Sequence, residues 1–255
     1  MTAGPPHGAG RPRAAGGTGK ADGPSVTDLL ERGEMEVHGR IAGSSNATLL
    51  VTCVLDGTEL LAVYKPARGE RPLWDFPSGL HRREVAARVL SDALGWGVVP
   101  ETVDRHDGPF GPGSVQRFVP EDGTSHYFTL LEDPAWHPDL ARFAAFDVVA
   151  NNADRKSGHI LLAEERLWGI DHGLTFHPQP KLRTVIWDFA GQPLPDEVVA
   201  DLTRLANGVP AELGEHLDPE EVAAVVRRAD RLARAGALPE PDGDRDWPPY
   251  PWPLV

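Results

Sequence analysis

The spacing of hydrophobic residues changes along this chain and divides it into expected strands and helices. In the first half, short apolar runs lie between Gly, Asp and Pro positions, a pattern typical of antiparallel strands. Elsewhere, apolar residues recur every three to four positions, which predicts helices. We expect strands over 34–41, 49–55, 59–64, 98–103 and 113–119, and helices over 26–32, 81–94, 139–151, 196–206 and 218–235.

Two short apolar runs, 160–163 and 167–170, enclose the polar turn 164–166. This pattern predicts a hairpin, whose two ends meet in space. Asp154 precedes the hairpin and Asp171 follows it, so we expect their carboxylates to lie side by side. The alternative is that both aspartates only serve in turns or caps.

Two carboxylates beside the cations Arg155 and Lys156 have the composition that metal-assisted phosphoryl transfer needs. One acid positions or deprotonates the acceptor, the other holds Mg²⁺ on the phosphates, and a cation balances the transferring charge.

A loop of small residues, 42–48, joins the first two expected strands and contains Ser44 and Ser45, and the third strand ends on Lys65. Backbone N–H groups and hydroxyls of such a loop can approach phosphates closely, and the lysine can reach the same phosphates. A plain antiparallel meander with a surface lysine would give the same pattern.

Glu84 is expected in the first turn of its helix, where it either pairs with Lys65 or only complements the helix dipole. Further on, the segment 115–121 leaves the last expected strand for polar sequence, as a linker between two lobes would. We expect its backbone, at Arg117 and Val119, to bind the adenine edge of a nucleotide.

The composition narrows the class of protein. A chain of 255 residues with 40% hydrophobic content can build a real core. No apolar run approaches the ~20 residues of a membrane helix, and no apolar segment follows the N-terminal charges, so no signal peptide is expected. Cys53 is the only cysteine, which excludes disulfides and Cys-based zinc sites within the chain and favours a cytoplasmic location.

The net charge is −13, which makes the chain a poor generic binder of nucleic acid or of anionic membranes. We therefore expect no nucleic-acid partner and no stable membrane association. Composition leaves the oligomeric state open. Near the C-terminus, Trp247, Tyr250 and Trp252 lie among prolines. They form either an apolar strap on the body of the protein, which the aromatic residues favour, or a peptide offered to a partner.

Taken in order, these motifs resemble the atypical kinases grouped around the phosphatidylinositol 3- and 4-kinases. The runs that carry the resemblance are Asn152 to Arg155 (NADR), Ile160-Leu161 and Ile170 to Phe176 (IDHGLTF). Type II phosphatidylinositol 4-kinases are the most similar, because they carry Asn-x-Asp-Arg and Asp-Asn-Gly-Leu-x-Phe at similar spacing. HipA-type toxin kinases and secretory-pathway kinases are more distant. The resemblance covers residues 35 to about 205.

This resemblance implies an α+β, two-lobed protein-kinase-like fold. An antiparallel sheet with one helix would form the N-lobe, and a mostly helical C-lobe would carry the catalytic hairpin. The expected divisions are a disordered tail over 1–24, an N-lobe over 25–120, a C-lobe over 121–238 and a Pro/Trp-rich tail over 239–255.

The resemblance also assigns roles to single residues. Asp154 would be the catalytic aspartate, Asp171 the Mg²⁺ ligand and Lys65 the lysine on the phosphates. Ser44 and Ser45 would belong to the loop that covers the phosphates. The implied activity is transfer of the γ-phosphate of ATP, with Mg²⁺ or Mn²⁺, to a hydroxyl of a protein or soluble small molecule. A lipid acceptor is disfavoured by the single cysteine and the negative charge.

One position departs from the family. Five residues after the catalytic aspartate these kinases usually place Asn as a second metal ligand, and here His159 takes its place. Imidazole suits Mn²⁺ or softer ions better than Mg²⁺, so His159 binds a metal, changes the metal preference or only packs. Lys156 stands where several relatives have His and could neutralise charge on the transferring group. The departure leaves open a nucleotide-binding pseudokinase. Further alternatives are an AMP-transferring enzyme on the same fold and an interaction module that uses the C-terminal tail.

Overall fold

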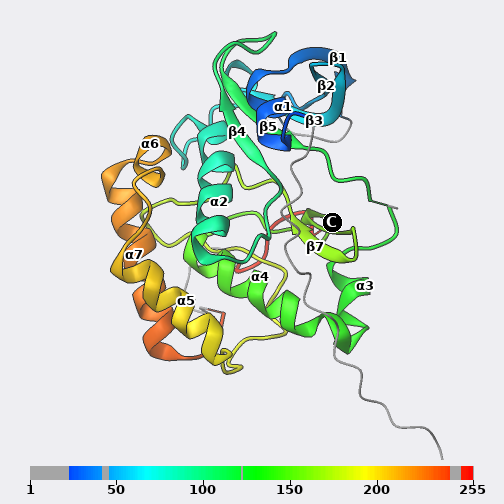
Figure 1. The fold of residues 1–255 in the computed structure, drawn as a ribbon. Coiled ribbons are helices and arrows are strands. Elements are labelled where there is room, and N and C mark those ends of the chain that lie inside the picture. The colour runs from blue at the N-terminus through cyan, green and yellow to red at the C-terminus, as the bar shows by residue number, and fades with distance from the viewer. Residues whose placement is uncertain (1–22, 42–45, 122, 242–247, 255) are drawn as a thin grey trace, which may run out of the picture.

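Strands gather in the N-terminal part of the chain and helices in the C-terminal part (Figure 1). This arrangement follows the change in hydrophobic spacing and confirms the expected α+β class. The computed structural model describes residues 23–41, 46–121, 123–241 and 248–254.

A five-stranded antiparallel sheet has the strand order β1-β2-β3-β5-β4. Its central hairpin turns at Asp56 and Gly57, which both have positive φ as a two-residue turn requires. The strands are β1 (Glu34–Arg40), β2 (Leu49–Leu55), β3 (Thr58–Pro66), β4 (Thr102–Arg105) and β5 (Gly113–Arg117).

Helices α1 and α2 contact this sheet, and α2 also contacts α4, α5 and α6, so it links the sheet to the helical part (Figure 1). A separate two-stranded hairpin, β6 and β7, follows α4. The helices are α1 (Val26–Arg32), α2 (Leu80–Leu94), α3 (Tyr127–Leu131), α4 (His137–Ala150), α5 (Asp196–Asn207), α6 (Leu213–His216) and α7 (Pro219–Ala235), and the hairpin strands are β6 (Ile160–Ala163) and β7 (Arg166–Gly169).

Most of these elements begin and end within one or two residues of the expected positions. The strand expected over 98–103 is wrong in its first half, because Val98 and Val99 pack into the helical core and β4 starts only afterwards. Strand β3 runs one residue past Lys65, which therefore lies within the sheet, paired with Ser114. The short helices α3 and α6 lie where no helix was expected.

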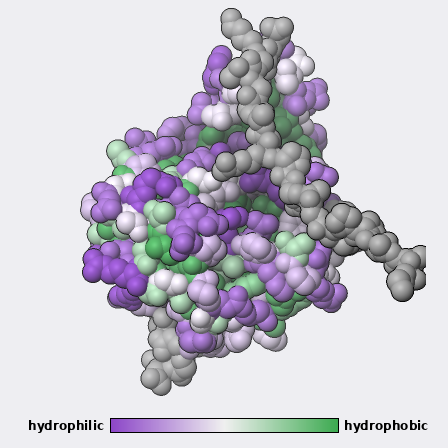
Figure 2. Space-filling model, turned by 60° about the horizontal axis from the view of Figure 1, so that its bottom comes forward, coloured by the Kyte–Doolittle hydropathy of each residue, from purple (hydrophilic) through white to green (hydrophobic). Residues whose placement is uncertain are grey.

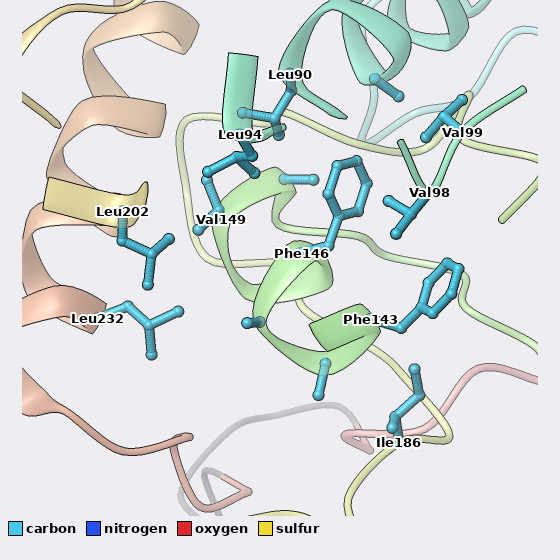
Figure 3. Packing of buried hydrophobic residues seen from close by; sticks show 14 of the residues in the cluster. Leu90, Leu94, Val98, Val99, Phe143, Phe146, Val149, Ile186, Leu202 and Leu232 are labelled. Carbon is cyan, nitrogen blue, oxygen red and sulfur yellow. The ribbon is translucent and has the colours of Figure 1, made fainter. Parts of the chain in front are cut away.

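The main hydrophobic core surrounds α4 (Figure 3). Phe143 and Phe146 of α4 lie among residues of α2 and the segment that follows it, while Leu202 of α5 and Leu232 of α7 pack on another side. Because α2 contributes to this core, the two parts of the chain share packing. The division into lobes at residues 25–120 and 121–238 stays a prediction.

A smaller cluster lies under the sheet and includes Leu30 of α1 with Val51 and Tyr64. Cys53 belongs to it and is fully buried, as expected of a small hydrophobic residue. Burial raises the pKa of its thiol, so Cys53 has none of the properties of a nucleophile.

Hydrophilic residues dominate the face shown in Figure 2, and hydrophobic residues appear there only in small patches. This distribution is ordinary for a protein whose core is built inside one chain. Across the described ranges, each helix is too short or too polar to cross a membrane.

Candidate active site

The loop that carries Asp154 begins where α4 ends. Asn151 closes the helix in the left-handed conformation, with φ 53°, which Asn tolerates better than most residues. The side chain of Asn152 then donates to Asp147 of α4 at 3.0 Å and accepts the N–H of Asp154 at 3.0 Å. The two asparagines therefore stop the helix and fix the backbone at Asp154.

Arg155 is fully buried and binds Asp147, which is also fully buried, through its Nε and Nη2 atoms at 2.9 to 3.2 Å. This arrangement corrects the expectation that Arg155 helps to balance the charge of a transferring phosphate. Because the buried guanidinium of Arg155 is bound to the carboxylate of Asp147, it cannot reach a ligand, and Arg155 is a structural residue.

The same guanidinium also holds the base of the hairpin. Arg155 Nη1 donates to the carbonyls of His159 and Ile170 at 3.1 and 3.2 Å, and the N–H of Ile170 donates to His159 O at 3.0 Å. The ends of β6 and β7 therefore meet as predicted. As a result, Asp154 and Asp171 line one cavity, which confirms that they lie on the same side of the hairpin.

Lys65 of β3 lies between two acids from other elements. Its Nζ forms an ion pair with Glu84 of α2 and donates to Asp171 at 2.9 Å. Glu84 also accepts the backbone N–H of His172 at 2.9 Å. The predicted Lys65–Glu84 ion pair is therefore present. Because α2 begins at Leu80, Glu84 lies in the second turn and not at the dipole end of the helix.

Electrostatics favour the charged forms of this group. Burial lowers the pKa of Lys65, but the charges of Asp171 and Glu84 outweigh burial and raise that pKa above its usual value. The charge of Lys65 in turn holds the pKa of Asp171 well below its ordinary range. Asp171 also has φ 59°, in the left-handed region. Unusual backbone of this kind concentrates at functional sites.

Asp154 lies opposite this group and pairs with Lys156 at 3.1 Å. Burial raises the pKa of the Asp154 carboxyl, and the charge of Lys156 opposes that rise. A carboxylate with a raised pKa accepts a proton more readily, which suits a general base. About a quarter of the Asp154 side chain, 24%, is exposed, so it can be reached from the cavity.

His159 Nε2 lies 3.4 Å from Asp171 Oδ2, while its Nδ1 faces the N–H of Lys156 at 3.4 Å. Burial lowers the pKa of His159 to about 4, so the ring is neutral at physiological pH. With Nδ1 as the acceptor, the ring proton is on Nε2, which lies farther from Asp171 Oδ2 than an ordinary N–H···O hydrogen bond allows. His159 thus lies beside Asp171 without a hydrogen bond to it, and a metal at Nε2 would have to replace that proton.

A cavity of about 530 Å³ lies between the sheet and the hairpin. The linked side chains of Lys65, Glu84 and Asp171 line it together with Asp154. Residues of the loop 66–79 and of the C-terminal segment complete its wall. The cavity thus collects charged groups from five separate parts of the sequence.

The described residues offer few protein ligands for a divalent metal. Over the part of the chain that the structure describes, no three His, Cys, Asp or Glu side chains gather closely enough to hold an ion by themselves. Mg²⁺ commonly takes only one or two protein carboxylates and fills its other positions with substrate phosphates and water. The half-exposed carboxylate of Asp171, with His159 beside it, fits such a site.

Arg117 and Val119, two predicted nucleotide contacts, are not among the described residues that line the cavity. The side chain of Arg117 is bound by Glu101 and Glu164 at 2.7 and 2.8 Å, and its backbone N–H donates to Glu101 O at 2.8 Å, so only its carbonyl could contact a nucleotide. Val119 is buried in a small cluster with residues of the hairpin. Ser44 and Ser45 lie outside the described residues.

Sequence reasoning missed Glu70, whose carboxylate accepts the N–H groups of Gly79 and His81 at 2.9 and 2.8 Å and contacts His81 Nδ1 at 2.6 Å. These contacts fix the loop 66–79 to the start of α2. An acid eleven residues before a histidine gives no local signal. The missed role of Asp147 has the same cause, since Asp147 looks like an ordinary polar position in a helix.

No family model matches this chain. The Mycobacterium tuberculosis protein Rv2133c is 38% identical over an alignment of 268 residues. The alignment covers 88% of this chain and 94% of the relative. The chain belongs to the same family as Rv2133c.

Three solved structures share the fold. A Golgi casein kinase matches with a TM-score of 0.53 and 16% identity over 82% of this chain and 72% of its own. The Golgi casein kinase with Mn/ADP bound has a TM-score of 0.55 and 16% identity, over 86% of this chain and 79% of its own. Hydra Fam20 with sugar has a TM-score of 0.58 and 14% identity, over 82% of this chain and 86% of its own. These likenesses confirm the kinase-like fold. The closer resemblance to type II phosphatidylinositol 4-kinases stays a prediction.

Proposed function

We propose that this protein is an ATP-dependent phosphotransferase that moves the γ-phosphate of ATP to a hydroxyl of a protein or small soluble acceptor. The link among Lys65, Glu84 and Asp171 carries the proposal, because it places a fixed cation and a half-exposed carboxylate on a cavity that also holds Asp154. The shared fold with a kinase described with Mn/ADP bound supports ATP and a divalent ion as cofactors.

In this proposal Asp154 accepts the proton of the acceptor hydroxyl. The hydroxyl oxygen forms a bond to the γ-phosphorus, the bond from that phosphorus to the β–γ bridging oxygen breaks, and ADP leaves. Lys156 stays paired with Asp154 and offsets negative charge beside the reacting group. Lys65 binds the phosphates and fixes their position. A bound Mg²⁺ or Mn²⁺, held by Asp171 with His159 beside it, would neutralise charge on the phosphates.

Other parts of the nucleotide would meet the chain where the sequence predicts. The backbone at Arg117 and Val119 would bind the adenine edge, and Ser44 and Ser45 would cover the phosphates. The lobes over 25–120 and 121–238 would then enclose the nucleotide between them. We place the reaction in the cytoplasm, as the cysteine content favours.

Labelled ATP tests this proposal. With Mg²⁺ or Mn²⁺, the purified protein should hydrolyse ATP or label itself from γ-labelled ATP, and Asp171→Ala should abolish both. Label that enters the protein from α-labelled ATP would show AMP transfer instead. Absence of any turnover together with no effect of Asp171→Ala would refute the phosphotransferase.

His159 favours one second candidate, a pseudokinase that binds nucleotide without chemistry. Its neutral ring has a proton on Nε2, 3.4 Å from Asp171 Oδ2, whereas the kinases it resembles place an amide oxygen at this position. A thermal-shift titration separates the two functions. Stabilisation by ATP and metal without turnover would support the pseudokinase, whereas stabilisation with turnover would support the enzyme.

A further inference from the structure

The C-terminal segment Pro248–Leu254 is attached to the catalytic loop, although more than 90 residues separate them in sequence. The backbone N–H of Ser157 donates to the carbonyl of Leu254 at 2.9 Å. Ser157 is fully buried and lies between Lys156 and His159.

A second attachment lies at the other end of the segment. The carbonyl of Pro249 accepts the backbone N–H of Thr184 at 3.0 Å and the indole N–H of Trp187 at 3.1 Å. Between the two attachments, Pro251 is buried. The segment 248–254 is thus fixed at both ends and in the middle, through its backbone and a proline. The aromatic residues that favoured a strap do not make these contacts, because Tyr250 and Trp252 are 45% and 88% exposed. Trp247 lies outside the described residues.

The residues that receive the strap are themselves bound to the catalytic loop. The N–H of Arg155 donates to Arg183 O at 3.1 Å, and the N–H of Val185 donates to Arg155 O at 3.2 Å. The hydroxyl of Thr184 also donates to the buried carboxylate of Asp147 at 3.2 Å. The 183–185 strip therefore has backbone hydrogen bonds to both the catalytic loop and the C-terminal strap, and the strap also bonds the loop directly at Ser157.

The strap also reaches the cavity, because Pro253 lines it together with Asp154 and Lys156. Lys65 and Glu84 bind to one another and to the segment at 171–172, and none of their hydrogen bonds involves the strap. The strap thus touches the part of the cavity that would hold the acceptor and not the lysine that would hold the phosphates.

We infer that the C-terminal strap, Pro248–Leu254, is a positioning element of the catalytic loop and forms the acceptor-side wall of the active site. This inference rests on the proposed phosphotransferase. Through Ser157 the strap fixes the backbone between Lys156 and His159, and through Pro253 it borders the position of the acceptor hydroxyl. It acts on the transfer step and leaves nucleotide binding unchanged.

Two variants test this role. A chain that ends at Trp247 lacks the whole strap, and Trp187→Phe removes one hydrogen bond to it while keeping an aromatic ring. Trp136→Phe makes the same chemical change outside the strap contact and serves as the control. For each protein, ATP turnover, self-labelling from γ-labelled ATP and the Kd for Mn²⁺-ADP are measured, with the unfolding midpoint as a check of folding.

We expect the shortened chain to lose about ten- to a hundredfold in kcat, the range that a small misplacement of reacting groups costs. Its Kd for Mn²⁺-ADP should change less than twofold, and a synthetic peptide of residues 248–255 should restore turnover. Trp187→Phe should show a smaller loss of kcat in the same direction, and Trp136→Phe none.

Unchanged turnover in the shortened chain would overturn the inference and leave the proposed phosphotransferase intact. Increased turnover would do the same, because it would mark the strap as an inhibitor. A Kd that weakens in parallel with kcat would also overturn it. No turnover in the full chain would instead remove the phosphotransferase itself. If the shortened chain fails to fold, the kcat of Trp187→Phe is compared with that of Trp136→Phe. Equal kcat values for these two variants would overturn the inference.

Discussion

Two clusters, each of which pairs a cation with an acid, lie at the loop that follows α4. They differ in their access to water. In one cluster, Arg155 and Asp147 have side chains with 0% exposure. In the other, the side chain of Asp171 is 50% exposed, and that of Lys65 is 20% exposed. The first cluster is closed to any ligand, whereas the second opens on the cavity.

This difference assigns the two clusters different tasks. A buried ion pair is favourable only when hydrogen bonds satisfy all of its groups, and removal of one partner leaves an unpaired charge. Arg155 meets this condition by binding one carboxylate, two carbonyls and His172 Nε2 at 2.9 Å. The side chains of Lys65 and Asp171 both line the cavity, so a ligand that enters it can contact either of them.

Arg155→Ala should have the largest effect, since it leaves the Asp147 carboxylate buried without its partner. We expect the free energy of unfolding to fall by about 3–5 kcal/mol and activity to disappear with the shape of the loop. Urea denaturation measures the change. Arg234→Ala, which breaks an exposed pair with Asp230, should cost less than about 1 kcal/mol. Equal losses for the two variants would contradict the contrast between closed and open clusters.

Asp154→Asn should lower the rate of phosphate transfer by about 10²–10⁴-fold, the range that a general base contributes. Burial already disfavours the charged form of Asp154, so the neutral amide should leave the unfolding midpoint unchanged or slightly raised. Steady-state turnover and a thermal melt measure the two quantities. A large loss of stability would instead assign Asp154 to the structural cluster.

Glu84→Gln should weaken nucleotide binding, because Lys65 loses a charged partner that fixes its position. Hydrogen bonds to charged groups contribute about 1.5–3 kcal/mol, so we expect the Kd for Mn²⁺-ADP to rise about tenfold or more. Calorimetric titration measures this Kd. Asp92→Asn changes a half-exposed acid on the same helix and should leave it unaltered. An unchanged Kd in Glu84→Gln would show that Asp171 alone fixes the lysine.

The smallest expected effect is that of Glu70, and it disappears in acid. Burial raises its pKa, but hydrogen bonds from His81 and the neighbouring backbone outweigh burial and lower it from 4.5 to about 2. The stability that Glu70 contributes is therefore complete above pH 4.5 and is lost as the pH falls towards 2. Unfolding of the natural protein and of Glu70→Gln should differ at pH 6 and converge near pH 2–3. A difference independent of pH would refute the assigned cause.

The pattern of the sequence was sufficient for most of the elements and for the two acids of the hairpin. Period-two and period-3.6 spacing is a local property, so β2 and α2 appear almost where the spacing predicts them. The hairpin itself brings Asp154 and Asp171 to one cavity. Segment 98–101 was misassigned because apolar residues in a strand and in a buried extended connection look alike.

The order of strands and helices and the types of side chain that reach the site follow from the sequence pattern. Which charges are closed off and which are open depends on how distant elements pack. Arg155 and Lys156 are adjacent cations in the sequence, yet one is sealed against Asp147 and the other lines the cavity. Desolvation depends on every element packed around a group, so neither the role of Arg155 nor the strap on the catalytic loop could be read from neighbouring residues.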